Sequence, residues 1–308
     1  MTNRSNEPVI WRLTDGKAGH DAQSSGLCLA LKDKYSCRIA EVDCPPLINL
    51  FTGKWQDLKN SPAPDLIIGA GHATHLPMLW ACHCTGAASV VIMKPSLPSG
   101  WFDLCLVPEH DAVTTADNIV TTRGAMNSIK PSNTLVQDQG LIMIGGPSKR
   151  HGWDNEQLLS MIETMTSKSD SIHWTITDSP RTPVATATAL SKLTHDQLEY
   201  QSYRQTDRAW LVDRLTTCGS RWVTEDSVSM IYEALTAGGN SYIFPTPRKR
   251  EDKVTRSLDK LYEAGYLGKF ESWLQATHHL KHIELNESAR CAELVFQRLL
   301  ASKGFSAP

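Results

Sequence analysis

The chain lacks the features that mark several common classes of protein. No stretch approaches the roughly 18 apolar residues that cross a bilayer, and the N-terminal residues MTNRSNEPVIW contain no apolar run typical of a signal peptide. The formal net charge of −2 supplies no overall positive field for nucleic acid. We therefore expect a cytoplasmic protein that does not bind nucleic acid.

Three ligand-binding motifs are also missing. The glycine turns have neither the G-x-G-x-x-G spacing of a dinucleotide-binding fold nor the form of a Walker A loop, and no D-x-D element suggests metal-dependent transfer. The first absence argues against a nucleotide-sugar epimerase or dehydrogenase that uses a nicotinamide cofactor. We expect neither a cofactor nor a metal.

The eight cysteines are scattered, mostly within apolar segments, which favours reduced and buried thiols. The segment GHATHLPMLWACHC is the one arrangement that could hold zinc, through His72, His75, Cys82, His83 and Cys84. On a helix, however, Cys82 and Cys84 diverge by about 200°. Helix-packing residues are the favoured interpretation.

Short β-branched runs followed by turns and helical patterns recur along the 308 residues, which is typical of the α/β class. Strands are predicted at 9–13, 38–42, 65–71, 89–94, 103–107, 140–144, 172–177, 221–224 and 241–244. The polar segment 123–139 is typical of a linker. We predict two Rossmann-like, doubly wound parallel-sheet domains, residues 1–135 and 136–308, with their strand ends at a shared cleft.

The first predicted strand is followed by a glycine-rich loop, TDGKAGHDAQSSGL. Gly16 and Gly19 permit close backbone approach, the next helix start attracts an anion, and Lys17 adds a positive charge. Either Asp15 or His20 could remove a proton from an acceptor hydroxyl. The alternative is a glycine turn in which Asp15 only caps the helix.

Two loops of the second half also follow predicted strands. The segment GGPSKRHGW sets Gly145 and Gly146 before Ser148 and Lys149, which suits a pyrophosphate. The segment TDSPRTP holds three further candidates, Ser179, Arg181 and Thr182. A guanidinium suits a phosphate, but a surface arginine beside a proline turn is an equally good interpretation.

The segment WVTEDSVSMIYEA places five polar residues between a strand and a helix. Either Asp226 or Ser227 would cap this helix, and the N–H groups of residues 227–229, with Ser229, could hold a phosphate. Glu233 could then reach a ribose hydroxyl. A capped helix needs one such residue, so the excess favours a ligand. Together, these loops suggest a nucleotide-sugar donor on the second domain and an acceptor on the first.

Six motifs of this chain resemble, in order, the ELM/GtrOC family of glycosyltransferase-like proteins, which is named partly after a plant mitochondrial fission factor. They are WRLTDGKAGHDAQSSGL, DLIIGAGHATH, FDLCLVPEHD, LIMIGGPSKRHGW, SPRTP and WVTEDSVSMIYEA. The resemblance covers residues 10–300 and implies a GT-B-like fold whose last helix packs back on the N-terminal domain.

The family is distantly similar to the lipid II N-acetylglucosaminyltransferase and to lipid A disaccharide synthase, which implies inverting, metal-independent transfer to a cell-envelope glycan or glycolipid. The motif DGKAGH supports His20 near the acceptor, and TEDSVSMIYEA supports Ser227, Ser229 and Glu233 at the donor. We also expect the acceptor beside Gly71, His72 and Asp111, with Glu109 as a reserve catalytic residue.

Two alternatives stay open. The segment PTPRKREDKVTR could meet anionic lipid at the inner face of the inner membrane, although such a run is more often a solvated helix start. The chain could also be a non-catalytic GT-B-like scaffold or a nucleotide-binding protein, as the fission-factor relatives suggest.

Overall fold

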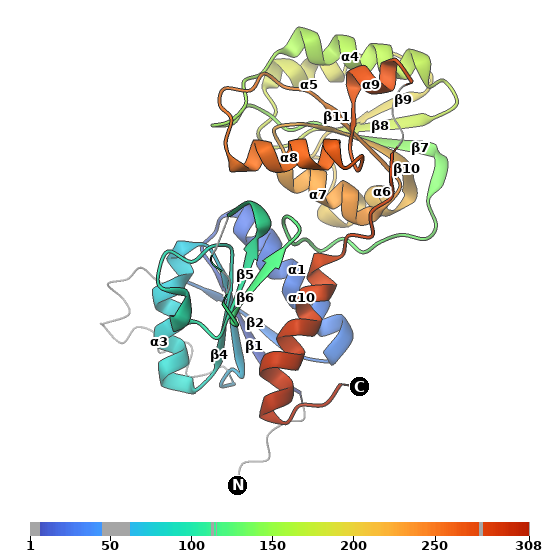
Figure 1. The fold of residues 1–308 in the computed structure, drawn as a ribbon. Helices are drawn as coiled ribbons and strands as arrows, with labels where there is room; N and C mark the ends of the chain where they lie inside the picture. Colours follow the sequence, from blue (N-terminus) through green and yellow to red (C-terminus); the bar gives the residue numbers. More distant parts are fainter. Residues whose placement is uncertain (1–6, 45–61, 112–113, 115, 277–279, 308) are drawn as a thin grey trace. The chain divides into compact units, whose positions relative to one another are not determined.

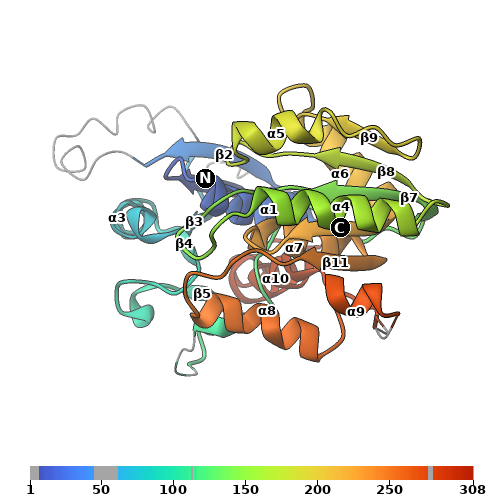
Figure 2. The same cartoon turned by 90° about the horizontal axis from the view of Figure 1, so that it is seen from above.

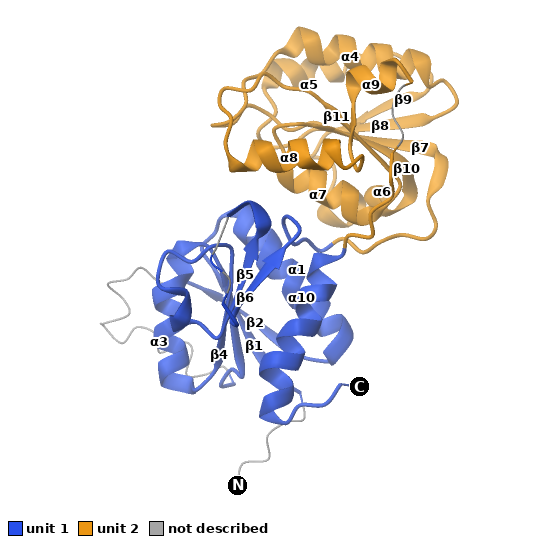
Figure 3. Ribbon diagram, in the orientation of Figure 1, with its two compact units in different colours: residues 1–128, 286–308 blue, residues 129–285 orange. Residues whose placement is uncertain are grey.

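The computed structural model describes residues 7–44, 62–111, 114, 116–276 and 280–307, and its contacts divide the chain into two units (Figures 1 and 3). Unit 1 comprises residues 1–128 and 286–308, and unit 2 comprises residues 129–285. The sequence placed the boundary at 135/136. Each unit contains one six-stranded parallel sheet with helices on both faces, so the predicted α/β class is confirmed.

The sheet of unit 1 is all parallel and has the order β2-β1-β3-β4-β5-β6. Its strands are β1 (Val9–Thr14), β2 (Arg38–Asp43), β3 (Leu66–Ala70), β4 (Ala88–Ile92), β5 (Leu104–Pro108) and β6 (Ile119–Thr122). Its helices are α1 (Ala18–Tyr35), α3 (His75–Thr85) and α10 (Glu287–Val295), with short turns η2 (His72–Thr74), η3 (Ser99–Trp101) and η4 (Glu109–Asp111). Helix α10 continues through η5 (Phe296–Leu300) and η6 (Ala301–Lys303).

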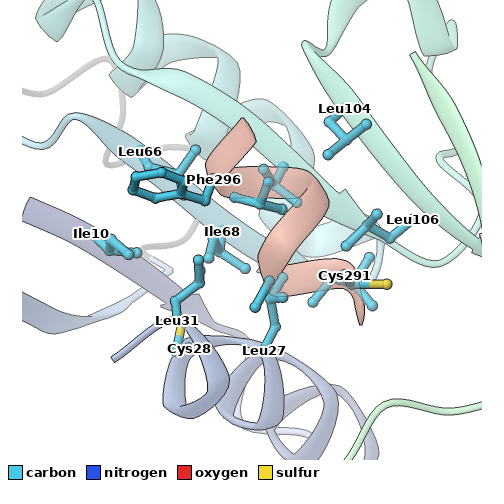
Figure 4. Packing of buried hydrophobic residues seen from close by; sticks show 14 of the residues in the cluster. Ile10, Leu27, Cys28, Leu31, Leu66, Ile68, Leu104, Leu106, Cys291 and Phe296 are labelled. Atoms are coloured by element: carbon cyan, nitrogen blue, oxygen red, sulfur yellow. The ribbon is translucent and has the colours of Figure 1, made fainter. Parts of the chain in front are cut away.

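Helices α1 and α10 cover one face of this sheet, and α3 covers the other. Figure 4 shows the first interface, where Leu27 and Leu31 of α1 meet Ile68 of β3 and Cys291 of α10. Strand β3 is buried along its whole length, as its unbroken apolar run predicts for a central parallel strand. Because this packing includes α10, the end of the chain is part of the core of unit 1.

The sheet of unit 2 is also parallel and has the order β12-β11-β10-β7-β8-β9. Its strands are β7 (Val136–Met143), β8 (His173–Thr177), β9 (Leu198–Gln201), β10 (Cys218–Thr224), β11 (Asn240–Phe244) and β12 (Gly268–Lys269). Its helices are α4 (Asn155–Lys168), α5 (Val184–Leu190), α6 (Arg208–Thr217), α7 (Val228–Ala237), α8 (Lys253–Glu263) and α9 (Phe270–Leu274). Helices α4 and α5 lie on one face and α6 and α7 on the other (Figures 1 and 2).

Local sequence signals explain several helix starts. Helix α4 begins after Asp154 because the Asp154 carboxylate accepts from the N–H of Gln157 at 3.0 Å. Helix α8 begins with a reciprocal cap between Asp252 and Thr255.

Strands β6, β9 and β12 were not predicted. They lie at sheet edges, and β6 and β9 are largely half-buried, so their sequences contain no unbroken apolar run. The polar residues 136–139, assigned to the linker, are instead the exposed start of β7. Among the residues described, no helix is long and apolar enough to cross a membrane.

Candidate functional site

Each sheet has one place where the order of strands reverses. In unit 1, β1 lies between β2 and β3, and in unit 2, β7 lies between β8 and β10. Loops that leave such a reversal diverge and open a crevice at the carboxyl ends of the strands, where folds of this kind bind ligands. The predicted loops 15–20 and 145–150 follow β1 and β7, so each lies at the switch point of its own sheet.

Asp15 and His20, offered as alternative bases, form a pair. Nδ1 of His20 lies 3.0 and 3.1 Å from the two carboxylate oxygens of Asp15, and Nζ of Lys17 lies 3.1 Å from the same carboxylate. Burial by itself raises the pKa of Asp15, but the hydrogen bonds from His20 and Lys17 outweigh it and hold this pKa below its ordinary value. An ionised Asp15 places the proton of a neutral imidazole on Nδ1 and leaves Nε2 as the basic atom.

Gly71, after β3, provides the space for the His20 ring. A β-carbon at this position would lie 2.3 Å from Nδ1 and Cε1 of His20, and the φ of +85° also favours glycine. Gly16 has a φ of +73° in the turn before α1. Gly19 is exposed, and a β-carbon at this position would meet no atom within 4 Å, so the structure does not require glycine there.

A cavity of about 710 Å³ is lined by Asp15 of this pair, whereas His20 is not among its lining residues. Asp15, Gly16 and His72 contribute to its lining, together with His75, which was considered from the sequence only as a metal ligand. His75 is 1% exposed, and its Nδ1 lies 3.0 Å from Oγ of Ser96. Burial lowers the pKa of His75, so the ring is neutral near pH 7.

Glu109 and Asp111 do not join this group. Both lie in η4 after β5, and β5 is three strands from β1 in the sheet. At about 4.8 Å per strand, this separation is roughly 14 Å. Glu109 is exposed and Asp111 is buried, and neither lines the cavity. Their expected roles at the acceptor therefore have no support from the arrangement of the strands.

The zinc cluster considered for 72–84 does not form. His75 packs edge-on against Phe102, with ring centroids 5.4 Å apart, while Cys82 packs into the core and Cys84 is exposed. In the part of the chain that the structure describes, no three His, Cys, Asp or Glu side chains are grouped to hold a metal ion.

In unit 2, the glycine loop after β7 is held by the loop after β10. The N–H of Gly145 donates to Oγ1 of Thr224 at 2.8 Å, and that of Gly146 donates to Oδ2 of Asp226 at 3.0 Å. A β-carbon at Gly145 would lie 2.3 Å from the same carboxylate, and one at Gly146 would lie 2.0 Å from the carbonyl oxygen of Arg181. Both glycines are therefore required by the packing of three loops against one another.

Arg181 joins this network from the loop after β8. Its guanidinium lies 2.7 Å from Oδ2 of Asp226 and 2.7 Å from the carbonyl oxygen of Gly146. The Asp226 side chain is completely buried, whereas that of Arg181 is 43% exposed. Asp226 thus neutralises Arg181. Of the two residues offered as the cap of α7, Asp226 and Ser227, it is Ser227 that occupies the N-cap position.

The remaining loop residues divide into structural and exposed groups. Oγ1 of Thr182 accepts from the N–H of Ser179 at 2.9 Å and donates to the carbonyl oxygen of Gly145 at 2.5 Å. Oγ of Ser148 accepts from the N–H groups of Arg150 and His151. Lys149 is exposed. Of Ser148, Lys149, Ser179 and Thr182, only Lys149 is exposed.

The start of helix α7 presents hydrogen-bond donors that can bind a ligand at the carboxyl ends of the strands of unit 2. Ser227, its N-cap, makes no side-chain cap hydrogen bond, and Ser229 is exposed in the first turn. The first N–H groups of any α-helix have no acceptor within the helix, so those of Val228 and Ser229 can receive an anion. Glu233 is 5% exposed, and its Oε1 lies 2.6 Å from the guanidinium of Arg208, a partner that was not predicted from the sequence.

The basic segment 245–256 is partly neutralised by acidic groups. Arg248 binds both Glu225 and Asp259, and Arg250 lies 3.2 Å from Asp252. Strong hydrogen bonds to Asp259 and Glu225 raise the pKa of Arg248. The Arg248–Glu225 pair joins two strand-end loops that are 23 residues apart, so it leaves no local pattern in the sequence. These ion pairs favour the interpretation of this segment as a paired helix start.

A model of the family described as mitochondrial fission ELM1 matches residues 18–299. The chain belongs to this family. An uncharacterized protein of Rickettsia prowazekii (strain Madrid E) is 24% identical over 344 residues, which cover 93% of this chain and 97% of that protein. The predicted family resemblance is therefore confirmed over nearly the whole chain.

Solved structures show that this ELM1-family chain has a GT-B-like fold. Staphylococcus aureus MnaA with UDP has a TM-score of 0.63 at 12% identity, covering 97% of this chain and 98% of that one. Neisseria meningitidis UDP-GlcNAc 2-epimerase bound to UDP-GlcNAc has a TM-score of 0.56 at 10% sequence identity, and the match covers 95% of this chain and 99% of that one. Escherichia coli ADP-heptose LPS heptosyltransferase II has a TM-score of 0.51 at 11% sequence identity, and the match covers 96% of this chain and 99% of that one. The fold is thus similar to those of both transferases and epimerases.

Proposed function

We propose that this protein is a glycosyltransferase that moves a sugar from a nucleotide-sugar donor to a hydroxyl of a cell-envelope glycan or glycolipid. The observation that carries the proposal is the Asp15–His20 pair at the switch point of unit 1, in which Asp15 lines a cavity of about 710 Å³. A carboxylate that orients an imidazole is the arrangement by which proteins make a general base for a hydroxyl.

In the proposed reaction, unit 1 binds the acceptor in this cavity, beside Gly71 and His72. Nε2 of His20 removes the proton of the acceptor hydroxyl as its oxygen forms a bond to the anomeric carbon of the donor sugar. The bond between that carbon and the diphosphate breaks on the opposite face, so the configuration inverts. Asp15 stabilises the imidazolium that forms.

Unit 2 binds the donor at its own switch point. The diphosphate lies at the start of α7, against Ser227, Ser229 and the helix N–H groups, with Arg181 and Lys149 as cations, and Glu233 holds the ribose. These groups stabilise the leaving diphosphate, and no step in this proposal uses a metal. An acceptor of the lipid type brings the protein to the inner face of the inner membrane as a peripheral protein.

Transfer assays with a matched variant test this function. UDP is present in the MnaA structure and UDP-GlcNAc in the epimerase structure, so UDP-sugars are the first donors to test. We expect a donor-dependent rise in melting temperature and transfer to an envelope glycolipid extract. His20→Asn lowers kcat and leaves the donor-induced rise unchanged, because it affects the acceptor proton only.

Three outcomes would replace the proposal. Release of an epimerised donor without any acceptor would indicate an epimerase on the same fold. Nucleotide binding without turnover on any acceptor would indicate a nucleotide-binding scaffold. If no nucleotide or nucleotide-sugar changes the melting temperature, the proposed donor site is wrong.

A further inference from the structure

The loop after β7 contains His151, whose buried ring has no hydrogen-bond partner among the described residues. His151 is 1% exposed, and neither Nδ1 nor Nε2 has a partner among the residues described. Oδ1 of Asp226 is likewise buried without a partner, while Oδ2 accepts from Gly146 and Arg181. Folded proteins retain few such groups, and each calls for an explanation.

His151 lies within the strand-end loops of the proposed donor site. Its backbone forms an isolated antiparallel bridge with Arg248, which follows β11. The charged groups that act on its ring are Glu225 and Asp226 from the end of β10, Arg248, and Arg150 from its own loop. Strands β7, β10 and β11 are neighbours, so these groups come from adjacent strand ends.

Asp226 occupies the place that electrostatics favours for a phosphate. Its carboxylate comes directly before Ser227, the N-cap of α7, and it already holds the guanidinium of Arg181 and the N–H of Gly146. An anion at a helix start that binds an arginine and a loop N–H uses the contacts that a phosphate would use. A dianionic diphosphate therefore competes with Asp226 for the same partners.

We propose that a phosphate of the donor replaces Asp226 on Arg181 and on the N–H of Gly146, and that His151 then takes up one proton and becomes the counterion of Asp226. This inference rests on the proposed function. The proton comes from solvent and forms an N–H bond on the ring. The imidazolium donates to Oδ1 of Asp226, so a buried carboxylate is not left without a partner.

The protonation state of the free protein agrees with this exchange. Burial holds the pKa of His151 below its ordinary value, against the opposite effects of Glu225 and Asp226, so the ring is neutral near pH 7. Release of Asp226 from Arg181 strengthens the negative field at the ring and raises this pKa in the complex. Between the two pKa values, one proton enters with the donor, and affinity falls about tenfold for each unit of pH rise.

Calorimetry measures the uptake directly. UDP-N-acetylglucosamine, GDP-mannose and ADP-glucose are suitable probes because their diphosphate diesters do not change charge near neutral pH. Binding of each is measured at one pH in two buffers with different enthalpies of ionisation, and the difference gives the number of protons taken up. We expect about one proton for wild-type protein.

Two variants and one control separate this exchange from a structural role. His151→Gln abolishes the uptake and lowers affinity at pH 6 but not at pH 8. Asp226→Asn also abolishes the uptake, because the group that needs a counterion is gone, and it removes the pH dependence of binding. His173→Gln changes an exposed histidine of β8 and leaves one proton in the count.

The outcomes distinguish this inference from the function on which it depends. Binding of a probe without proton uptake, or with the same uptake in His151→Gln, overturns the exchange and leaves the donor site standing. Absence of binding by all three probes overturns both. A wild-type count of zero overturns the exchange even if a variant fails to fold.

Discussion

The ring of His20 lies against the backbone of Gly71, so closely that a β-carbon on residue 71 would be 2.3 Å from Nδ1 and Cε1. The segment after β1 can pack this closely against the loop after β3 only because residue 71 is a glycine and has no side chain. Because β1 and β3 are the strands at which the sheet order reverses, this contact forms at the switch point of unit 1. The position of the proposed base thus depends on a glycine from a different loop.

Gly71→Ala should lower kcat at least tenfold without changing donor affinity, because the new methyl group displaces the His20 ring. Transfer rates and donor-induced changes in melting temperature measure the two effects separately. Gly86→Ala is the matched control. Gly86 has a φ of +73°, and a β-carbon there would meet no atom within 4 Å, so the variant adds backbone strain of about 1 kcal/mol without a clash. Equal loss of activity in both variants would contradict the prediction.

Asp15→Asn should lower kcat by roughly 100-fold or more, because an amide stabilises the imidazolium poorly and permits the wrong tautomer of His20. Single-turnover rates with saturating donor measure the effect. Asp33→Asn, which changes an exposed carboxylate of the neighbouring helix α1, is the control. An unchanged kcat in Asp15→Asn would remove the pair from the proposed chemistry.

Glu233→Gln should weaken the binding of UDP about tenfold and that of 2′-deoxy-UDP much less, since the lost interaction is a charge-assisted hydrogen bond to a ribose hydroxyl. Arg208 lies on one carboxylate oxygen, and the other is the oxygen proposed for the ribose. Titration of both nucleotides with both proteins gives the answer. If the two nucleotides lose affinity equally, Glu233 acts only through Arg208.

Asp252→Ala should destabilise unit 2 by about 1 kcal/mol at pH 7, because it removes the cap of α8. Asp252→Asn keeps a capping side chain and loses only the ion pairs with Arg150 and Arg250, so its effect is smaller. Urea unfolding of the three proteins measures the difference.

The difference in the free energy of unfolding between the wild-type protein and Asp252→Asn should become smaller as the pH falls. Burial raises the pKa of Asp252, but hydrogen bonds from Arg150 and from the backbone N–H groups of Val254 and Thr255 outweigh burial and lower it to about 2. Since the unfolded value is about 3.9, the contribution of the charge is complete well above pH 4 and is lost as pH falls toward 2. A difference that grows on acidification would contradict this assignment.

Much of the fold was predictable because its signals are local. Strand β3 is an unbroken apolar run buried on both faces, and the start of α4 at Asp154 follows from one capping side chain. The edge strand β9 was missed because its four residues are exposed or half-buried and show neither an unbroken apolar run nor a clear alternation of apolar and polar residues. The candidate loops 15–20 and 145–150 were found because glycines after an apolar strand are a strong local signal.

By itself, the sequence determined two parallel α/β sheets and the strand-end loops that carry polar residues, since the period and length of apolar runs encode strands and helices locally. Only the tertiary structure decided which of those polar residues pair. Asp226 holds Arg181 across 45 residues of chain because strand order brings their loops together, and the His20 ring that pairs with Asp15 lies against Gly71 of another strand end. The same contacts left His151 buried without a partner among the described residues, which no pattern in the sequence could indicate.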